Sequence, residues 1–243
     1  MKFRFSLFML AVLVSVASVA QVNAVEFGKN RVQHKKFTWR FYETPNFYTY
    51  FNIGGNDLAK FVAQVAEEEL QQIEESVEYA LQRKANIIIY NDYNDYKSSN
   101  IGLGIDWQSS GGLTKLVNNK IVIYFNGNHN DLRRSVREGI VKTLVDNQLF
   151  GDDIGEFASN QALLDLPQWM IDGYISYIAE NWNAQKDDQL KDAMMSGEYK
   201  NFYQFAFKQP ALAGHAFWYF LADRYKKDNV PYFLYLTRIY KSL

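Results

Sequence analysis

The chain has 243 residues, with 26 basic and 27 acidic side chains and a formal net charge of −1. This balance leaves no positive excess to neutralise phosphates, so we expect no nucleic-acid partner. The absence of cysteine excludes disulfides and a lipoprotein anchor.

The first 24 residues have the pattern of a secretory signal peptide. Lys2 and Arg4 precede an apolar stretch from Leu7 to Ala20, and Val22-Asn23-Ala24 fits the small-x-small cleavage rule. Cleavage before Val25 removes both basic residues and leaves 24 basic against 27 acidic residues, a net charge of −3. An uncleaved membrane anchor is the alternative. Export without cysteine favours the bacterial periplasm or the outer membrane surface, with no transmembrane helix after signal removal.

Residues 25–130 are predicted to form a β-rich N-terminal subdomain. The expected elements are strands at 37–42 and 47–51, a helix from Asn56 or Asp57 to Gln82, a strand at 86–90 and a hairpin of 114–117 with 120–125. The apolar run 86–90 is typical of a central strand, and Asn118-Asn119 is a pair that tolerates positive φ in a turn. In the long helix, Glu67-Glu68-Glu69 is assigned to the solvated side.

Residues 131–243 are predicted to be helical and to form one compact unit with the β-rich segment. The helices are expected at Asp131–Leu149, Gln161–Leu164, Pro167–Asn181, Asp187–Met195, Gly214–Lys226 and Pro231–Lys241. A small mixed sheet with a long helix, followed by an all-helical half, belongs to the α+β class.

The helix expected from Asp131 carries Arg137-Glu138-Gly139-Ile140-Val141. Arg137 and Val141 are one turn apart on one face, which is the geometry that lets the two histidines of His-Glu-x-x-His hold a zinc ion. Glu138 occupies the position of the general base that polarises the metal-bound water. Arginine has no lone pair to offer a metal and valine has no donor atom, so the motif lacks both ligands.

The order of strand, helix, strand, hairpin, motif helix and Pro-x-Trp-x-x-Asp-Gly helix resembles the gluzincin, or peptidase MA-like, superfamily with its thermolysin-like architecture. More narrowly, the chain is similar to the N-terminal part of exported Bacteroidetes proteins that continue into a TolB-like β-propeller. The residues that carry this likeness are Phe27-Gly28-Lys29-Asn30-Arg31-Val32-Gln33, Arg137-Glu138-Gly139-Ile140, Leu166-Pro167-Gln168-Trp169, Asp172-Gly173, Gly214-His215-Ala216-Phe217-Trp218-Tyr219 and Leu236-Thr237-Arg238.

The resemblance implies that Asp172 matches the third, carboxylate ligand and that a propeller follows in a longer chain. Because Arg137 and Val141 replace the histidines, we expect no metal, no cofactor and no catalytic residue, and the vestigial positions are Arg137, Glu138, Val141 and Asp172. We expect the Arg137 guanidinium to form an ion pair with Asp172 or Glu138, since a buried carboxylate needs a partner.

The leading hypothesis is a catalytically inactive binding or scaffold domain whose partner is an envelope protein or peptide. A groove beside the hairpin, with Trp107, Lys115, Asn118, Asn119 and Trp169 as candidate residues, could accept an extended strand. One alternative is an active hydrolase that uses Glu138 and Asp172 with unusual ligands, and another is a glycan-binding module with an aromatic surface. The only histidines are His34, His129 and His215; we expect His129 to be exposed and His215 to bridge core elements by a hydrogen bond.

Overall fold

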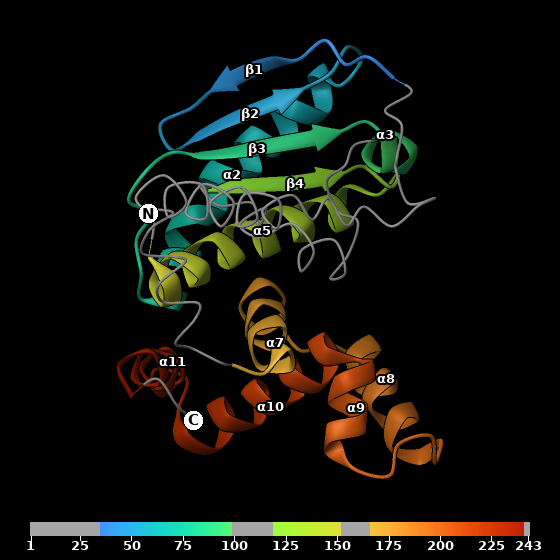
Figure 1. Cartoon of the computed structure of the whole chain (residues 1–243), viewed down its shortest axis with the longest axis vertical. Helices are drawn as coiled ribbons and strands as arrows, with labels where there is room; N and C mark the ends of the chain where they lie inside the picture. The colour runs from blue at the N-terminus through green and yellow to red at the C-terminus, as the bar shows by residue number, and fades with distance from the viewer. Residues whose placement is uncertain (1–34, 99–118, 152–165, 241–243) are drawn as a thin grey trace, which may run out of the picture.

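The computed structural model describes residues 35–98, 119–151 and 166–240. Its strands are β1 (Arg40–Glu43), β2 (Phe47–Phe51), β3 (Ala85–Tyr90) and β4 (Lys120–Tyr124). Its helices are α2 (Asn56–Val77), α3 (Tyr93–Ser98), α5 (His129–Phe150), α7 (Gln168–Ala179), α8 (Ala184–Met195), α9 (Phe202–Lys208), α10 (Pro210–Tyr225) and α11 (Asn229–Tyr240). The sequence-based α+β class is confirmed, with a small sheet on the N-terminal side and a mostly helical remainder (Figure 1).

The four strands form one sheet in the order β1-β2-β3-β4. β1 and β2 pair antiparallel around the turn at Pro45, whereas β2, β3 and β4 run parallel. Alternate residues of β2 and β3 are buried on one face, which explains the alternating pattern of Phe47-Tyr48-Thr49-Tyr50-Phe51. The carboxyl ends of β2, β3 and β4 therefore meet at one edge, next to α3 (Figure 1).

Helices α2 and α5 cover one face of the sheet (Figure 1). Apolar residues at helical spacing on α2, among them Val62, Ile73 and Val77, are fully buried there. Gly139 of α5 lies against the Ile121 side chain of β4, so the glycine of the motif brings the helix close to the sheet. The same hydrophobic core continues from these elements into α7, α10 and α11.

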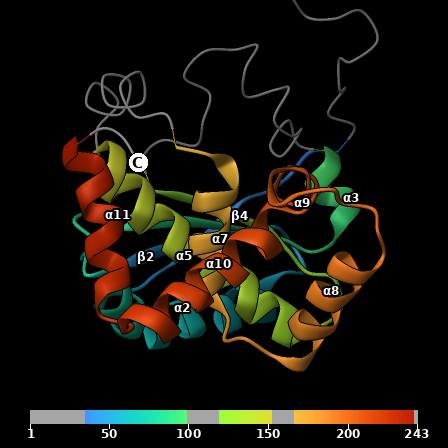
Figure 2. The same cartoon turned by 90° about the horizontal axis from the view of Figure 1, so that it is seen from below.

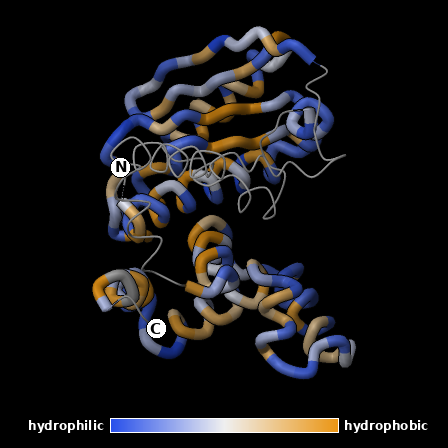
Figure 3. The backbone as a smooth tube through the Cα atoms, in the orientation of Figure 1, coloured by the Kyte–Doolittle hydropathy of each residue, from blue (hydrophilic) through white to orange (hydrophobic). Residues whose placement is uncertain are grey.

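The C-terminal helices form a layer on the far side of α5 from the sheet, as Figures 1 and 2 show from two directions. α7 and α10 are its apolar centre (Figure 3). Their main chains touch at Gly173 and Gly214, where a Cβ atom on either residue would collide with the facing backbone. The Trp218 indole, fully buried, donates to the Met170 carbonyl oxygen at 2.9 Å.

Two short helices were not predicted from the sequence, and both begin with a polar side-chain cap. In α3 the Asp92 carboxylate accepts from the Asp95 amide, and in α9 the Asn201 side chain accepts from the Gln204 amide. The helix expected to reach Gln82 ends at Val77, because Glu78 adopts a left-handed conformation with φ of 56°. The predicted hairpin strand 114–117 and helix 161–164 lie outside the described residues.

Asn119 has a φ of 53°, as its place before β4 predicted. The residues proposed as signal peptide, 1–24, also lie outside the described part of the chain. Within that part, the helices are too short or too polar to cross a bilayer.

Candidate functional site

The motif residues lie in the middle of α5, which is bounded by two well-defined ends. Asn128 is the N-cap, and its side chain accepts a hydrogen bond from the Asn130 amide. The helix ends at Gly151, whose φ of 91° suits glycine. α5 thus begins slightly before Asp131, the cap expected from the sequence, and Asp131 instead occupies the first turn.

The expected ion pair of Arg137 with Asp172 or Glu138 is wrong. The Arg137 guanidinium forms its ion pair with Glu69 of α2, and both side chains are largely buried, with 19% and 10% of their surface exposed. Its Nε atom also donates to the Ala179 carbonyl at 2.7 Å, and Nη2 donates to the Ile178 carbonyl at 3.3 Å. Arg137 therefore joins three helices, α2, α5 and α7.

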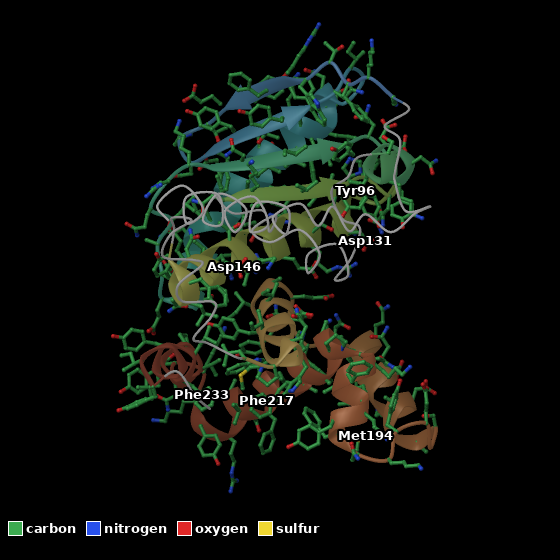
Figure 4. All side chains as sticks on the ribbon, viewed as in Figure 1. Tyr96, Asp131, Asp146, Met194, Phe217 and Phe233 are labelled. Carbon is green, nitrogen blue, oxygen red and sulfur yellow. The ribbon has the colours of Figure 1, made fainter. Side chains whose placement is uncertain are left out.

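The direction of α7 explains the error. α5 and α7 run past each other in opposite directions, so Arg137 faces the carboxyl end of α7, while Asp172 lies near its amino end. There Asp172 accepts a hydrogen bond from Gln168 at 2.7 Å. The pKa of Lys142 is raised chiefly by Asp146 and to a smaller extent by Asp172. Asp172 therefore lies near Lys142, one turn further along α5 than Arg137. Figure 4 labels Asp131 and Asp146 towards the two ends of α5, with α7 below the stretch between them.

The pairing of Glu69 with Arg137 was not predicted, because the run Glu67-Glu68-Glu69 was assigned to the solvent-exposed side of the helix. Glu69 is buried, whereas Glu68 is exposed. Arg133, one turn before Arg137, donates from Nε to Glu69 at 2.7 Å and forms an ion pair with the same carboxylate. The signal was present in the sequence as two arginines four residues apart on α5, a spacing that turns both toward one neighbour.

Val141, which the resemblance aligned with a second ligand, is fully buried in the hydrophobic core. Its neighbours Ile140 and Leu144 on the same helix are also buried. The Val141 side chain therefore packs in the core, and it has no nitrogen, oxygen or sulfur atom that could coordinate a metal ion. Within the described residues no group of three or more His, Asp or Glu side chains is arranged to hold a metal ion.

Glu138, which the resemblance aligned with a general base, is half-buried beside α7 and α8. Within the described residues its carboxylate has no hydrogen-bond or ion-pair partner. Burial is the main cause that raises the pKa of Glu138, and the Glu180 carboxylate raises it further. The positive charges of Arg134 and Lys186 lower it. Arg134 and Lys186 both lie near Glu180, at 3.9 Å and 3.2 Å. Arg134, Glu180 and Lys186 are thus the charged neighbours of Glu138, whereas Asp172 lies near Lys142.

A buried polar pair lies next to this cluster, between α7 and α10. Ser176 Oγ and His215 Nδ1 are 2.9 Å apart, and the Lys186 ammonium is 3.4 Å from the same hydroxyl. This confirms the prediction that His215 links core elements by a hydrogen bond. Burial, with a smaller effect of Lys186, lowers the pKa of His215 to about 3, so the imidazole is neutral at physiological pH. Trp182 and Tyr177 meet its ring edge to face.

His129 is exposed at the start of α5, as predicted, and its ring packs against Phe61 and Phe125. His34 lies outside the described residues.

The proposed groove residues are only partly within the described chain; Trp107, Lys115 and Asn118 lie outside it. Asn119 was expected at the groove, but its side chain is buried. It accepts a hydrogen bond from Asn147 at 2.9 Å and donates one to the Arg83 carbonyl at 3.1 Å. Trp169 is half-buried and meets Phe202 and Phe217 edge to face, so it packs between α7, α9 and α10. In the described residues both side chains thus make contacts within the protein.

Comparison with known proteins gives no assignment: no family model and no curated protein matches this chain.

Proposed function

We propose that the chain is a non-catalytic, metallopeptidase-like interaction domain of the bacterial cell envelope. The observation that supports this proposal concerns Arg137 and Val141, which stand where His-Glu-x-x-His has its two histidines. Both side chains make structural contacts within the protein. Arg137 holds α7 to α2 through Glu69, and Val141 fills the core. A cation and a hydrocarbon at these positions offer no lone pair to zinc, and the positive charge repels it.

The edge of the sheet formed by β4, next to α5, is where we propose that a partner binds. β4 is the last strand of the described sheet, and α5 packs beneath it. The Asn86 amide donates to the Asn119 carbonyl at 2.7 Å, and the Phe125 amide donates to the Tyr90 carbonyl at 3.0 Å. Since alternate residues of a parallel strand face the same neighbour, residues 119, 121, 123 and 125 bond to β3.

The remaining residues of β4 have their main-chain groups directed away from β3. The N–H and C=O of Lys120, Val122 and Tyr124 face the outer edge, and no described strand pairs with them. The hairpin strand expected at 114–117 would lie along this same edge, so the proposal requires that a partner strand, and not 114–117, pairs with β4 there. An extended peptide can add to such an edge through main-chain hydrogen bonds. We therefore assign the partner as an extended segment of an envelope protein or peptide that binds along β4.

The experiment selects short peptides by display against the whole protein and measures their binding to two variants. Val122→Pro removes the outward N–H while leaving the bonds of residues 121 and 123 to β3. Val122→Thr keeps both the N–H and the branched shape and is the matched control. We expect selected peptides to bind the wild type and Val122→Thr equally and Val122→Pro at least about tenfold more weakly.

Two outcomes contradict the proposal. One is a selection that yields no binding peptide, and the other is equal binding to a folded Val122→Pro variant. Circular dichroism and urea unfolding establish that this variant is folded. The hydrolase alternative predicts instead that bound peptides are cleaved and that Glu138→Gln abolishes the cleavage, which mass spectrometry of the recovered peptides detects.

A further inference from the structure

A shallow pocket of about 550 Å³, largely open to solvent, lies where the parallel strands β3 and β4 end. One wall is the segment 91–94 after β3, and the other is formed by Tyr124, the last residue of β4, and the segment 125–127 after it. Ligands of sheets with parallel strands bind outside the carboxyl ends of the strands, and volumes of about 300–1,000 Å³ are usual for ligand pockets. α3 stands beside this edge of the sheet (Figure 1).

The side chains at the pocket combine aromatic rings with unpaired polar groups. The rings of Tyr93 and Tyr124 are 5.0 Å apart and inclined by 49°. In the described part of the chain neither hydroxyl has a hydrogen-bond partner, and neither does the exposed Asn94 amide. These three residues can therefore donate and accept hydrogen bonds with a ligand.

Behind the pocket, further aromatic rings contact one another along the outer face of the sheet. Tyr96 lies 5.2 Å from Tyr124, Tyr90 lies 5.9 Å from Tyr96, and Trp39 lies 5.4 Å from Tyr90, measured between ring centres. Trp39 at the far end is 39% exposed. Figure 4 labels Tyr96 at α3, on the same side of the molecule as Asp131 at the start of α5. Tyr90 is only 3% exposed, so these inner rings support the pocket, and Tyr93, with 46% of its surface exposed, is the ring that a ligand can reach.

Hydrogen bonds within the protein hold the walls of the pocket in place. Asn91 donates to the Ile53 carbonyl at 3.0 Å, and Asn126 donates to Asp131 at 2.8 Å. At α3, both carboxylate oxygens of Asp95 accept from the Lys35 ammonium, at 2.6 and 2.7 Å. A site that is already ordered loses less conformational entropy when a ligand binds.

We propose that this pocket binds a neutral oligosaccharide. Sugar rings present C–H faces, which are attracted to the negative faces of aromatic rings, and a rim of hydroxyls that matches the free Tyr and Asn groups. Asp92 lines the pocket, and the Lys97 ammonium lies over the Tyr93 ring at 4.7 Å from its centre, so the site has one charge of each sign and no excess that would favour an ionic ligand. Tyr124 belongs to the β4 edge through its main chain and to this pocket through its ring, but the oligosaccharide proposal does not require the peptide proposal.

The test uses the whole protein and three neutral oligosaccharides, chitotetraose, cellohexaose and maltohexaose. Calorimetry and amide chemical shifts measure binding, and the shifts are expected in residues 91–94 and 124–127. Tyr93→Ala removes an exposed ring and is expected to raise Kd about three- to tenfold. Tyr203→Ala, on α9, removes a tyrosine that is 78% exposed and is the matched control, with no expected change.

Val122→Pro is included because it separates the two proposals. If the pocket binds sugar, this variant binds it as well as the wild type does, whatever happens to peptide binding. The oligosaccharide proposal is overturned if none of the three sugars binds below about 10 mM, or if the shifts lie elsewhere. It is also overturned if Tyr93→Ala and Tyr203→Ala bind the sugar equally.

Discussion

Arg137 on α5 donates a hydrogen bond to the main-chain carbonyl of Ala179, the last residue of α7. The final carbonyls of a helix have no partner within the helix and carry partial negative charge. The guanidinium satisfies this end while its other side is paired with Glu69. Arg137, which the resemblance aligned with a zinc ligand, thus stabilises the packing of α2, α5 and α7.

Removing this arginine should destabilise the protein strongly. Arg137→Ala leaves a largely buried Glu69 with Arg133 as its remaining cation and leaves the end of α7 uncapped, so we expect a loss of about 2–4 kcal/mol in the free energy of unfolding. Urea denaturation measures it. Arg134→Ala is the control, because its side chain is 42% exposed and its surface ion pairs contribute about 1 kcal/mol or less. Similar losses for the two variants would contradict the assigned role.

The carboxyl of Glu138 should make stability depend on pH. Burial raises its pKa above the ordinary value, so the folded state holds the proton to a higher pH than the unfolded state does. Stability contributed by the protonated form is present at acidic pH and is lost as pH rises above about 4.5. Glu138→Gln should therefore be more stable than the wild type at pH 7, with little difference at pH 4.

Urea midpoints at both pH values test this expectation for Glu138. Glu198→Gln, which replaces an exposed carboxylate, provides the comparison. A Glu138→Gln variant that is less stable than the wild type at pH 7 would mean that the charged carboxylate is favourably paired in solution.

The contact between α7 and α10 should tolerate no added methyl group. Gly173→Ala places a Cβ against the backbone of Gly214, which has no flexible side chain to move, so we expect a loss of at least about 3 kcal/mol or failure to fold. Gly139→Ala meets the Ile121 side chain, which can shift, so its loss should be smaller. Thermal unfolding of both variants measures the difference. Equal stability of the two would show that the main chains are further apart than described.

Zinc should neither bind tightly to the motif nor stabilise the fold. Because Arg137 and Val141 supply no ligand atoms, we expect no zinc-dependent rise in Tm for the natively produced protein and less than one equivalent of metal after dialysis. Metal analysis and thermal unfolding measure both quantities. A stoichiometric zinc ion that is lost in Glu138→Gln or Asp172→Asn would reject the non-catalytic proposal and favour the hydrolase.

The sequence predicts the periodic elements well because each is governed by local pattern. The strand predicted at 47–51 has the same bounds in the structure, and the apolar stripe of α2 is buried as expected. The short helices α3 and α9 were missed because two turns are too few for a recognisable period. In them the caps formed by Asp92 and Asn201 are the stronger signal.

The partner of Arg137 could not be derived from spacing alone. Helical periodicity places Arg137 and Val141 on one face, but it does not give the direction in which α7 crosses α5. That direction decides whether the guanidinium meets Asp172 or the Ala179 carbonyl. The burial of Glu69 depends on the same packing, because α2 and α5 lie side by side although they are more than sixty residues apart in the chain.

The direct contact of Gly173 with Gly214 has a consequence for motion. Where side chains separate two helices, the helices can slide by changing rotamers, but here main chain meets main chain. α7 and α10 are therefore coupled as one rigid body. Any shape change of the helical layer must therefore leave this pair intact and come from the elements packed around it.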